Sequence, residues 1–534
     1  MQKGGLIKNK NLDIVIINGT LIDGTGKERY KTDIRITGGK IADINKNIGP
    51  ADITINAKDL VAAPGVIDIH GHSNATVYMN PSFESKIFQG ITTEVWGNCG
   101  QSFAPILRGE NREIVKEILS ASLGAENLNM EWSSFREYLK HLPKLGINVL
   151  PLIGHAIIRT NIMGRSDRKP TKKEMKSMIK LLEECLEMGA YGMSTGLEYS
   201  PGSFSTKDEL IELCKVLVKY NAFYSTHIRN EDKNLWTSID EALEVCERSG
   251  CPVHIAHLKL AGMNNWGQSK RLLNYLTDAH KKGLAVTWDV YPYTAWGGGF
   301  EDLFPAIEKV HDKLAKMSPN SELKKKLKMD ITQEMKLRGS SWDKITITHA
   351  LKSHGVSGKN IREIAVENNE DVLDTFFRIL LENNGNVKII GHDMTHEDMK
   401  LLLKHPDTII ATDSRAITYD SISEQKHPHP RYCGSIPKIL RFAREGLFSF
   451  EEAIRKMTSL PADRMKLWNR GRIEKGKNAD LMIFDPNTVT DNATYENPVQ
   501  PPTGIDYVIV NGYLVIYEGV HTGNLKGKLL KRKC

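Results

Sequence analysis

The sequence lacks the features that would place this chain in a membrane or outside the cell. It contains no stretch of about 18 apolar residues, so we expect no membrane-spanning helix. The first residues, Met1–Lys10, are polar and offer no apolar segment of the kind that a secretory signal needs. The seven cysteines are odd in number and widely spread, which argues against a disulfide framework. These absences predict a protein of the reducing cytoplasm.

The sequence also lacks a strong concentration of charge within its main body. The net charge is +7, but Lys and Arg are scattered among nearly as many acids. The one basic cluster is the tail Lys526–Lys533, which we interpret as a solvated terminus and not as a nucleic-acid-binding patch. No aliphatic run follows Cys534, so the tail is not a prenylation signal. We therefore expect neither nucleic acid nor membrane as a partner, and make no prediction of the oligomeric state.

The two ends of the chain share a pattern that predicts one small β-domain. Asp13–Ile22 and Asp506–Val515 each contain a β-branched run, an Asn-Gly pair and a second apolar run. Because Asn-Gly tolerates positive φ at both central turn positions, each segment predicts a type I′ hairpin. We expect residues 6–63 and 470–520 to form a β-sandwich together, with 521–534 as the basic tail.

Between these ends, short strands alternate with amphipathic helices. That alternation predicts a parallel sheet, and eight strands predict a closed (β/α)8 barrel over 64–469. A Lys- and Glu-rich insertion at about 295–342 would lie near the mouth of the site. The segment Val387–Ile390 competes with Val286–Val290 for the seventh strand. The expected strands are Val66–Ile69, Thr92–Trp96, Val149–Ile153, Gly192–Thr195, Phe223–Thr226, Val253–Ala256, Val286–Val290 and Ile409–Ala411.

Five of these strand ends offer a side chain that can bind a metal. His70 and His72 stand at i and i+2, so they can project together from the end of a strand. Cys99 lies between glycines after the next strand, although a single cysteine is more often a small buried thiol. His-x-His alone is a weak signal, and the cluster of strand ends is the stronger one.

The remaining strand ends continue the pattern. His227 and His257 each close a short apolar strand, whereas His254 faces the other side and is expected to pack in the core. Asp413 also closes an apolar strand, where burial is costly unless the carboxylate meets a metal or a cation. Thiolate and imidazole are good zinc ligands, so the set predicts an open zinc site.

With these residues in place, the sequence resembles the D-aminoacylase (N-acyl-D-amino-acid deacylase) family of amidohydrolases, from about residue 12 to 520. The matching stretches include Gly65–His72, Gln89–Gly100, Met193–Gly202, Ser225–Glu231, Ile255–Lys259, Asp289–Tyr293, Asp413-Ser414, His427–Arg431 and Lys475–Leu481. The Asn-Cys-Gly motif around Cys99 and the string His-Pro-His-Pro-Arg ending at Arg431 are the most specific.

The resemblance implies a role for each matching position. Cys99, His227 and His257 would hold one tightly bound Zn²⁺, while His70, His72 and Asp413 would frame a second, weaker position. Glu198 takes the place of the carboxylated lysine of other amidohydrolases, so Cys99 or Glu198 would bridge two metals. Asp413 would act as the general base in hydrolysis of N-acyl-D-amino acids. The substrate carboxylate would bind to Lys259, Tyr291 and Arg431.

One departure and two alternatives stay open. After Tyr291–Ala295 the family commonly has serine or threonine, but here the chain reads Trp296-Gly-Gly-Gly299, so a substrate hydrogen bond is lost or remade. A cyclic-amide hydrolase of the hydantoinase or dihydroorotase kind would share the barrel and the His-x-His motif. A scaffold without a metal would share only the fold, and the intact ligand set argues against it.

Overall fold

The computed structural model describes residues 12–123, 128–303, 322–420 and 427–532. Eight strands form a parallel sheet in the order β16-β12-β11-β10-β9-β8-β7-β6, as the sequence predicts. They are β6 (Val66–Asp68), β7 (Ile91–Trp96), β8 (Asn148–Gly154), β9 (Gly192–Gly196), β10 (Phe223–His227), β11 (Val253–Ile255), β12 (Val286–Val290) and β16 (Thr408–Ile410).

The barrel closes at the ends of its first and last strands. Gly71 and Ser414 form a parallel bridge, and the amide of Asp413 donates to the carbonyl of His70 at 2.9 Å. The closure therefore runs through the segments that carry the candidate ligands. Alternate strand residues such as Ile67, Val95 and Leu152 fill the interior below this level.

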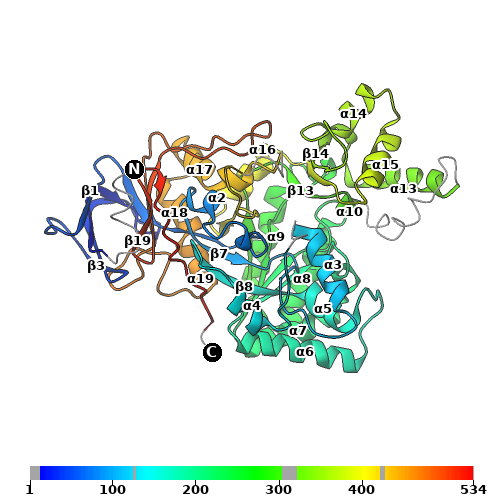
Figure 1. Ribbon diagram of the computed structural model, residues 1–534, viewed down its shortest axis with the longest axis horizontal. Coiled ribbons are helices and arrows are strands. Elements are labelled where there is room, and N and C mark those ends of the chain that lie inside the picture. Colours follow the sequence, from blue (N-terminus) through cyan, green and yellow to red (C-terminus); the bar gives the residue numbers. More distant parts are fainter. Residues whose placement is uncertain (1–11, 124–127, 304–321, 421–426, 533–534) are drawn as a thin grey trace.

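Helices cover the outside of the barrel (Figure 1). Their starts follow capping rules: the side chain of Thr171 accepts from the amide of Glu174, which caps Thr171 in return. The helices are α2 (Glu84–Ile87), α3 (Arg112–Leu123), α4 (Phe135–His141), α5 (His155–Met163), α6 (Lys172–Glu187), α7 (Lys207–Lys219), α8 (Leu235–Ser249), α9 (Ser269–Lys281), α16 (His396–Lys404), α17 (Arg431–Arg444), α18 (Phe450–Met457) and α19 (Ser459–Arg464). Within the described residues, no helix combines the length and apolar character needed to cross a bilayer.

Both ends of the chain contribute to one nine-stranded sheet beside the barrel (Figure 1, blue and red). Its strands are β1 (Ile14–Leu21), β2 (Tyr30–Thr37), β3 (Lys40–Asn45), β4 (Ile53–Asn56), β5 (Val61–Pro64), β17 (Leu481–Phe484), β18 (Ile505–Val510), β19 (Tyr513–Tyr517) and β20 (Val520–His521). The two halves meet where β5 pairs with β17.

The Asn-Gly pairs near the two chain ends behave differently. Asn511 and Gly512 have φ of 52° and 82° and connect β18 to β19, which confirms the predicted hairpin. The hairpin predicted at Asn18-Gly19 is wrong, because the pair lies inside β1. There Asn18, with φ of 62°, forms a β-bulge against β2. A β-bulge also needs a residue that tolerates positive φ, but the strand continues in the same direction after it.

Between β12 and β16 the chain forms a second, smaller sheet with its own core. Its order is β13-β15-β14, so Val387–Ile390 belongs here and β12 takes the seventh barrel position. Helices of the same described segment lie beside this sheet (Figure 1). Aromatic residues such as Phe376 and Trp342 belong to their shared core. The elements are β13 (Trp296–Gly299), α10 (Phe300–Leu303), α13 (Glu322–Arg338), β14 (Ile345–His349), α14 (Ile361–Glu367), α15 (Val372–Glu382) and β15 (Lys388–Gly391).

The basic tail is not a solvated terminus over its described part, which corrects the expectation. The amide of Gly527 donates to Leu145 at 2.7 Å, and that of Leu530 donates to Val149 at 2.9 Å. A side chain at Gly527 would collide with the carbonyl of Ile147, so glycine permits this close approach. Backbone pairing with the segment that enters β8 therefore holds the tail against the barrel.

Candidate metal centre

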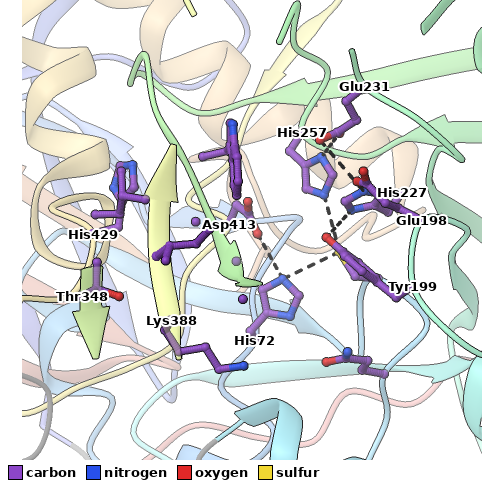
Figure 2. A pocket seen from close by; sticks show the side chains of 18 of the residues that line it. His72, Glu198, Tyr199, His227, Glu231, His257, Thr348, Lys388, Asp413 and His429 are labelled. Carbon is purple, nitrogen blue, oxygen red and sulfur yellow. Dashed lines mark hydrogen bonds and ion pairs between the residues drawn. The ribbon is translucent and has the colours of Figure 1, made fainter. Parts of the chain in front are cut away.

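The candidate ligands lie together at the carboxyl-terminal face of the barrel, and Figure 2 shows several of them around one pocket. His70 and His72 follow β6, Cys99 follows β7, His227 ends β10, His257 follows β11 and Asp413 follows β16. Cys99, His257 and Asp413 have φ of 52°, 35° and 49°. Such backbone conformations cost non-glycine residues roughly 1–3 kcal/mol and cluster at functional sites. The strain shared by three candidate ligands therefore supports a common function.

The thiol of Cys99 lies among three of the candidate histidines, and its sulfur and the ligand atoms of His70 and His257 all lie within 4.8 Å of one another. Its Sγ is 3.4 Å from Nε2 of His70, 3.5 Å from Nε2 of His257 and 3.9 Å from Nε2 of His72. Burial raises the pKa of Cys99, but the imidazoles of His70 and His257 outweigh it and hold this pKa well below its ordinary value. The site thus favours the thiolate, which is the form that binds metals.

A second group of potential ligands consists of His70, His72 and Asp413, whose ligand atoms all lie within 4.8 Å of one another. Nε2 of His72 is 3.1 Å from Oδ1 of Asp413. On the other oxygen, Oδ2 of Asp413 is 2.8 Å from Nη1 of Arg431. Burial raises the pKa of Asp413, but Arg431 and the histidines lower it to well below its usual range. The carboxylate is therefore ionised at neutral pH, as a general base must be, and the same contacts weaken its affinity for a proton.

Glu231 completes a third group, with His227 and His257, and was not among the predicted site residues. Its Oε1 lies 2.9 Å from Nδ1 of His257 and 2.6 Å from Nζ of Lys259. Burial raises the pKa of Glu231, but Lys259 and the two histidines lower it below the ordinary value. The available signal was its position four residues after His227, inside a stretch that matches the family.

Glu198 lies at the edge of the cluster and not at its centre. Its Oε2 is 3.0 Å from Nε2 of His227, and its Oε1 is 3.5 Å from Nη2 of Arg338. Among the described residues, no group of three ligand atoms within 4.8 Å includes Glu198. Tyr199 donates to, or accepts from, Nδ1 of His227 at 3.2 Å on the other side of that ring.

A second missed residue, Asp289, supports the ligands from below. Its Oδ2 is 3.3 Å from Nδ1 of His70 and 2.9 Å from Nε2 of His254, while Oδ1 accepts from the amide of His257 at 3.0 Å. This contact turns Nε2 of His70 toward Cys99, as an outer carboxylate commonly does for a ligating histidine. His254, expected only to pack, is thus part of the support. The signal was a carboxylate in the apolar strand Val286–Val290.

The three residues assigned to the substrate carboxylate also lie together. Nζ of Lys259 is 5.8 Å and the guanidinium carbon of Arg431 is 4.9 Å from the centre of the Tyr291 ring. The buried hydroxyl of Tyr291 has no hydrogen-bond partner within the described chain. Lys259, in contrast, already contacts Glu231, and Arg431 contacts Asp413. Arg431 is the first residue of helix α17.

The small sheet forms one wall of the pocket, which has a volume of about 370 Å³. The run Trp296–Gly299 lines it as strand β13, as does Lys388 from the neighbouring strand β15. Figure 2 shows Lys388 extending inward across the pocket from His227 and Glu231. The predicted insertion therefore reaches the site through its first residues and through Arg338 near its end, while 304–321 lie outside the described part.

Comparison with known proteins gives a consistent set of relatives. The model of the amidohydrolase family matches residues 54–296 and 353–516. The chain is 32% identical to an N-acyl-D-glutamate deacylase over 98% of this chain and 97% of the relative. It is 31% identical to a D-aminoacylase (97% and 98%) and 33% identical to an N-acyl-D-aspartate deacylase (96% and 93%). All three relatives are from Alcaligenes xylosoxydans xylosoxydans.

The solved structures agree. An N-acyl-D-glutamate deacylase from Bordetella bronchiseptica, in complex with zinc and a phosphonate inhibitor that mimics the tetrahedral intermediate, superposes with a TM-score of 0.80. It is 30% identical, and the match covers 98% of this chain and 100% of that one. A D-hydantoinase reaches a TM-score of only 0.54 at 15% identity, with 98% and 99% covered, so it shares the fold alone.

Proposed function

Because this chain belongs to the amidohydrolase family, we propose that it hydrolyses the amide bond of N-acyl-D-amino acids and releases a carboxylate and a free D-amino acid. The observation that carries this proposal is the position of Cys99 among His70, His72 and His257, with Asp413 beside them. Relatives of nearly equal length that carry deacylase names support the reaction class.

The donor set fits zinc. Atoms that bind one tetrahedral Zn²⁺ at the usual bond lengths stand roughly 3.3–3.8 Å apart. Sγ of Cys99 lies 3.5 Å from Nε2 of His257, which matches the edge of such a tetrahedron. We assign one tightly bound zinc to Cys99, His227 and His257. When bound, zinc supplies a Lewis acid that activates water at neutral pH and polarises the amide carbonyl.

A second, weaker metal position is assigned to His70, His72 and Asp413. Cys99 faces both groups, since its Sγ lies within 4 Å of His70, His72 and His257. Glu198 faces His227 only and is held on its other oxygen by Arg338. Cys99 is therefore the better candidate to bridge two metals, and Glu198 orients His227.

Asp413 is assigned as the general base. Its ionised carboxylate faces the ligand histidines, takes the proton of the attacking water and then gives it to the leaving amine nitrogen. The ion pair with Arg431 keeps this carboxylate ionised and fixes its direction. Arg431 is fixed in turn by the face of Tyr291.

The free carboxylate of the substrate is assigned to Arg431, with help from Tyr291 and Lys259. The hydroxyl of Tyr291, which has no hydrogen-bond partner within the described chain, supplies a donor on a ring that both cations approach. Arg431 has a planar fork of donors, and one of them, Nη1, contacts Asp413. A carboxylate bound here would stand beside the base, which places the amide next to the ligand cluster.

One experiment tests the reaction and its class. Protein with a measured zinc content is incubated with N-acetyl-D-amino acids, their L-enantiomers, hydantoin and dihydroorotate, with Asp413→Asn as the blank. We expect release of the free D-amino acid and no turnover of the cyclic amides. Turnover of a cyclic amide alone would favour the hydantoinase-like alternative, and no turnover of any substrate by the zinc-loaded protein would contradict the proposed reaction.

A further inference from the structure

A second large cavity lies at the opposite end of the barrel from the metal centre. It has a volume of about 740 Å³, larger than the pocket at the candidate site. Residues that precede strands line it, such as Tyr191 before β9 and Pro252 before β11, so it opens at the amino-terminal face. The segment after α19 and the chain's tail form the rest of its wall. We call it the basal cavity.

The basal cavity is lined by positive charge from two distant parts of the chain. None of its described lining residues is an aspartate or glutamate. Charged residues of one sign in a concave surface concentrate anions from solution. The basic lining residues are Arg464, Lys466, Arg470, Lys528, Lys531 and Arg532.

Arg464 is a partly buried cation of this wall, and within the described residues its hydrogen bonds are all to neutral groups. Its Nε donates to the hydroxyl of Thr287 at 2.8 Å, and its Nη2 donates to the carbonyl of Pro252 at 3.1 Å. Its guanidinium lies 4.5 Å from the centre of the Phe223 ring. Burial lowers the pKa of Arg464 to about 10. A buried cation without an opposite charge is costly, and an anion in the cavity would offset that cost.

The neighbouring cations Lys466 and Arg532 add to the positive electrostatic potential of the basal cavity. Burial and the charges of Arg464 and Arg532 lower the pKa of Lys466. Arg532 donates through Nη1 to the carbonyl of Tyr220, while its buried Nε and Nη2 have no hydrogen-bond partner within the described chain. Arg470 is different, because it contacts Asp480 and Asn511 and is already paired. Unused donors therefore come from both walls of the cavity.

The docking of the tail makes this arrangement costly without a ligand. Its backbone bonds bring Lys528, Lys531 and Arg532 up to Arg464 and Lys466, and like charges repel. Trp468, with 67% of its surface exposed, offers a flat apolar face on the same wall. Several cations beside one exposed indole suit a ligand that carries more than one negative charge and a ring.

We propose that the basal cavity binds a compound with a diphosphate group, held by Arg464, Lys466 and the tail cations Lys531 and Arg532. Arginine matches phosphate oxygens with its planar fork of donors, and two phosphates supply enough charge for several cations. The diphosphate could be inorganic or part of a nucleotide, in which case Trp468 stacks on the base. The site is separate from the metal centre and does not depend on the proposed reaction.

Calorimetric titration of the full-length, zinc-loaded protein with pyrophosphate and with ADP tests this. We expect saturable binding of both at constant ionic strength, and a rise in Tm with ligand concentration. The double variant Lys466→Gln/Lys531→Gln should weaken binding by about tenfold or more, since two charge-assisted contacts are lost. Lys475→Gln changes an exposed lysine outside the cavity and should leave the affinity unchanged.

Further measurements distinguish a nucleotide from a diphosphate group alone, and they exclude binding at the metal centre as the explanation. Tighter binding of ADP that Trp468→Ala reduces to the level of pyrophosphate would identify a nucleotide, whereas equal affinities would identify the diphosphate group alone. Pyrophosphate can also bind zinc, but this would be the same in wild type and in the double variant. Equal affinity of those two proteins, or no saturable binding of either compound, would overturn the proposal.

Discussion

The guanidinium of Arg431 and the carboxylate of Asp413 form an ion pair at 2.8 Å, inside the pocket and next to the histidine cluster. The sequence assigned these two residues to different tasks, one to the substrate and one to proton transfer. Their contact couples the tasks, because a substrate carboxylate that binds Arg431 must lie beside the base. It also means that loss of either charge leaves the other buried without its partner.

Replacement of Arg431 by methionine should lower kcat/KM for N-acetyl-D-amino acids by about one to two orders of magnitude. A charged hydrogen-bonded contact contributes roughly 1.5–3 kcal/mol, which corresponds to this range. For an N-acyl amine, which has no carboxylate, kcat/KM should fall less. That smaller fall would come only from Asp413, which has lost its partner. Arg165→Met, at the pocket rim and paired with Glu117, is the matched control. Equal losses on both substrates would show that Arg431 acts only through Asp413.

Replacement of Cys99 by alanine should remove most of the bound zinc. The thiolate is the ligand nearest to two histidines at once, so its loss opens the centre of the cluster. Elemental analysis of the purified variant measures the zinc content per chain. Cys185→Ala is the control, because that cysteine is also buried but lies on helix α6. Full zinc occupancy in Cys99→Ala would exclude the thiol as a ligand.

Asp413→Asn should fold, retain its tightly bound zinc and lose nearly all turnover. The tight position is assigned to Cys99, His227 and His257, whereas proton transfer needs the carboxylate. Asparagine keeps the shape and can still accept from His72, so the geometry should survive. Zinc content and kcat are measured on the same sample. Turnover near that of the wild type would mean that another group accepts the proton.

The positions of the candidate ligands were predictable because they follow from topology. In a parallel barrel all strands end at the same face, so His70, Cys99 and His257 had to meet once the strands were identified. The partners of the ligands were not predictable in this way. Glu231 reaches His257 from a loop, and Asp289 reaches His70 from a strand two places away in the closed barrel, so neither contact has a fixed sequence spacing.

The errors have local physical causes. Asn18-Gly19 and Asn511-Gly512 are the same dipeptide, but only the second is followed by a strand free to fold back. At the first, β1 continues past the bulge and pairs with β5. The tail was interpreted from its charge, whereas its placement depends on backbone hydrogen bonds made possible by Gly527. The charge of a segment indicates how well water solvates its side chains. It does not indicate whether its backbone pairs with an exposed strand of the fold.

Lys388 should favour substrates with an acidic side chain, a prediction that rests on the proposed function. It is the one charged residue that the small sheet contributes to the described pocket wall, where the rest is mostly glycine and isoleucine. Lys388→Gln should lower kcat/KM for N-acetyl-D-glutamate by about tenfold, the loss of one charged contact. N-acetyl-D-leucine should change little. Lys359→Gln, an exposed lysine paired with Glu367, is the control. Equal losses on both substrates would contradict this role.

Asp393 should make stability depend on pH. It is buried where the small sheet meets the barrel, and its Oδ1 accepts from Nε1 of Trp296 at 2.9 Å. Burial raises the pKa of Asp393 to about 6, and the nearby Asp232 adds to the rise although Trp296 opposes it. The folded chain therefore binds this proton more tightly than the unfolded chain, whose ordinary value is 3.8. The contribution of Asp393 to the free energy of unfolding should be greatest below pH 3.8. It should decrease as the pH rises from there through 6.

The replacement Asp393→Asn tests both the sign and the size of this contribution to stability. Asparagine is neutral at every pH and can still accept from Trp296, so the penalty for a buried charge disappears. The rise from 3.8 to about 6 corresponds to about 3 kcal/mol above pH 6. Thermal unfolding should show Asp393→Asn with a higher Tm than wild type at pH 8 and with an equal Tm near pH 4. Asp330→Asn, on the exposed face of α13, should follow the wild type at both. A variant less stable than wild type at pH 8 would mean that a positive charge stabilises the ionised carboxylate of Asp393. Arg338, which also pairs with Asp232 at 2.8 Å, is the cation that acts on Asp393.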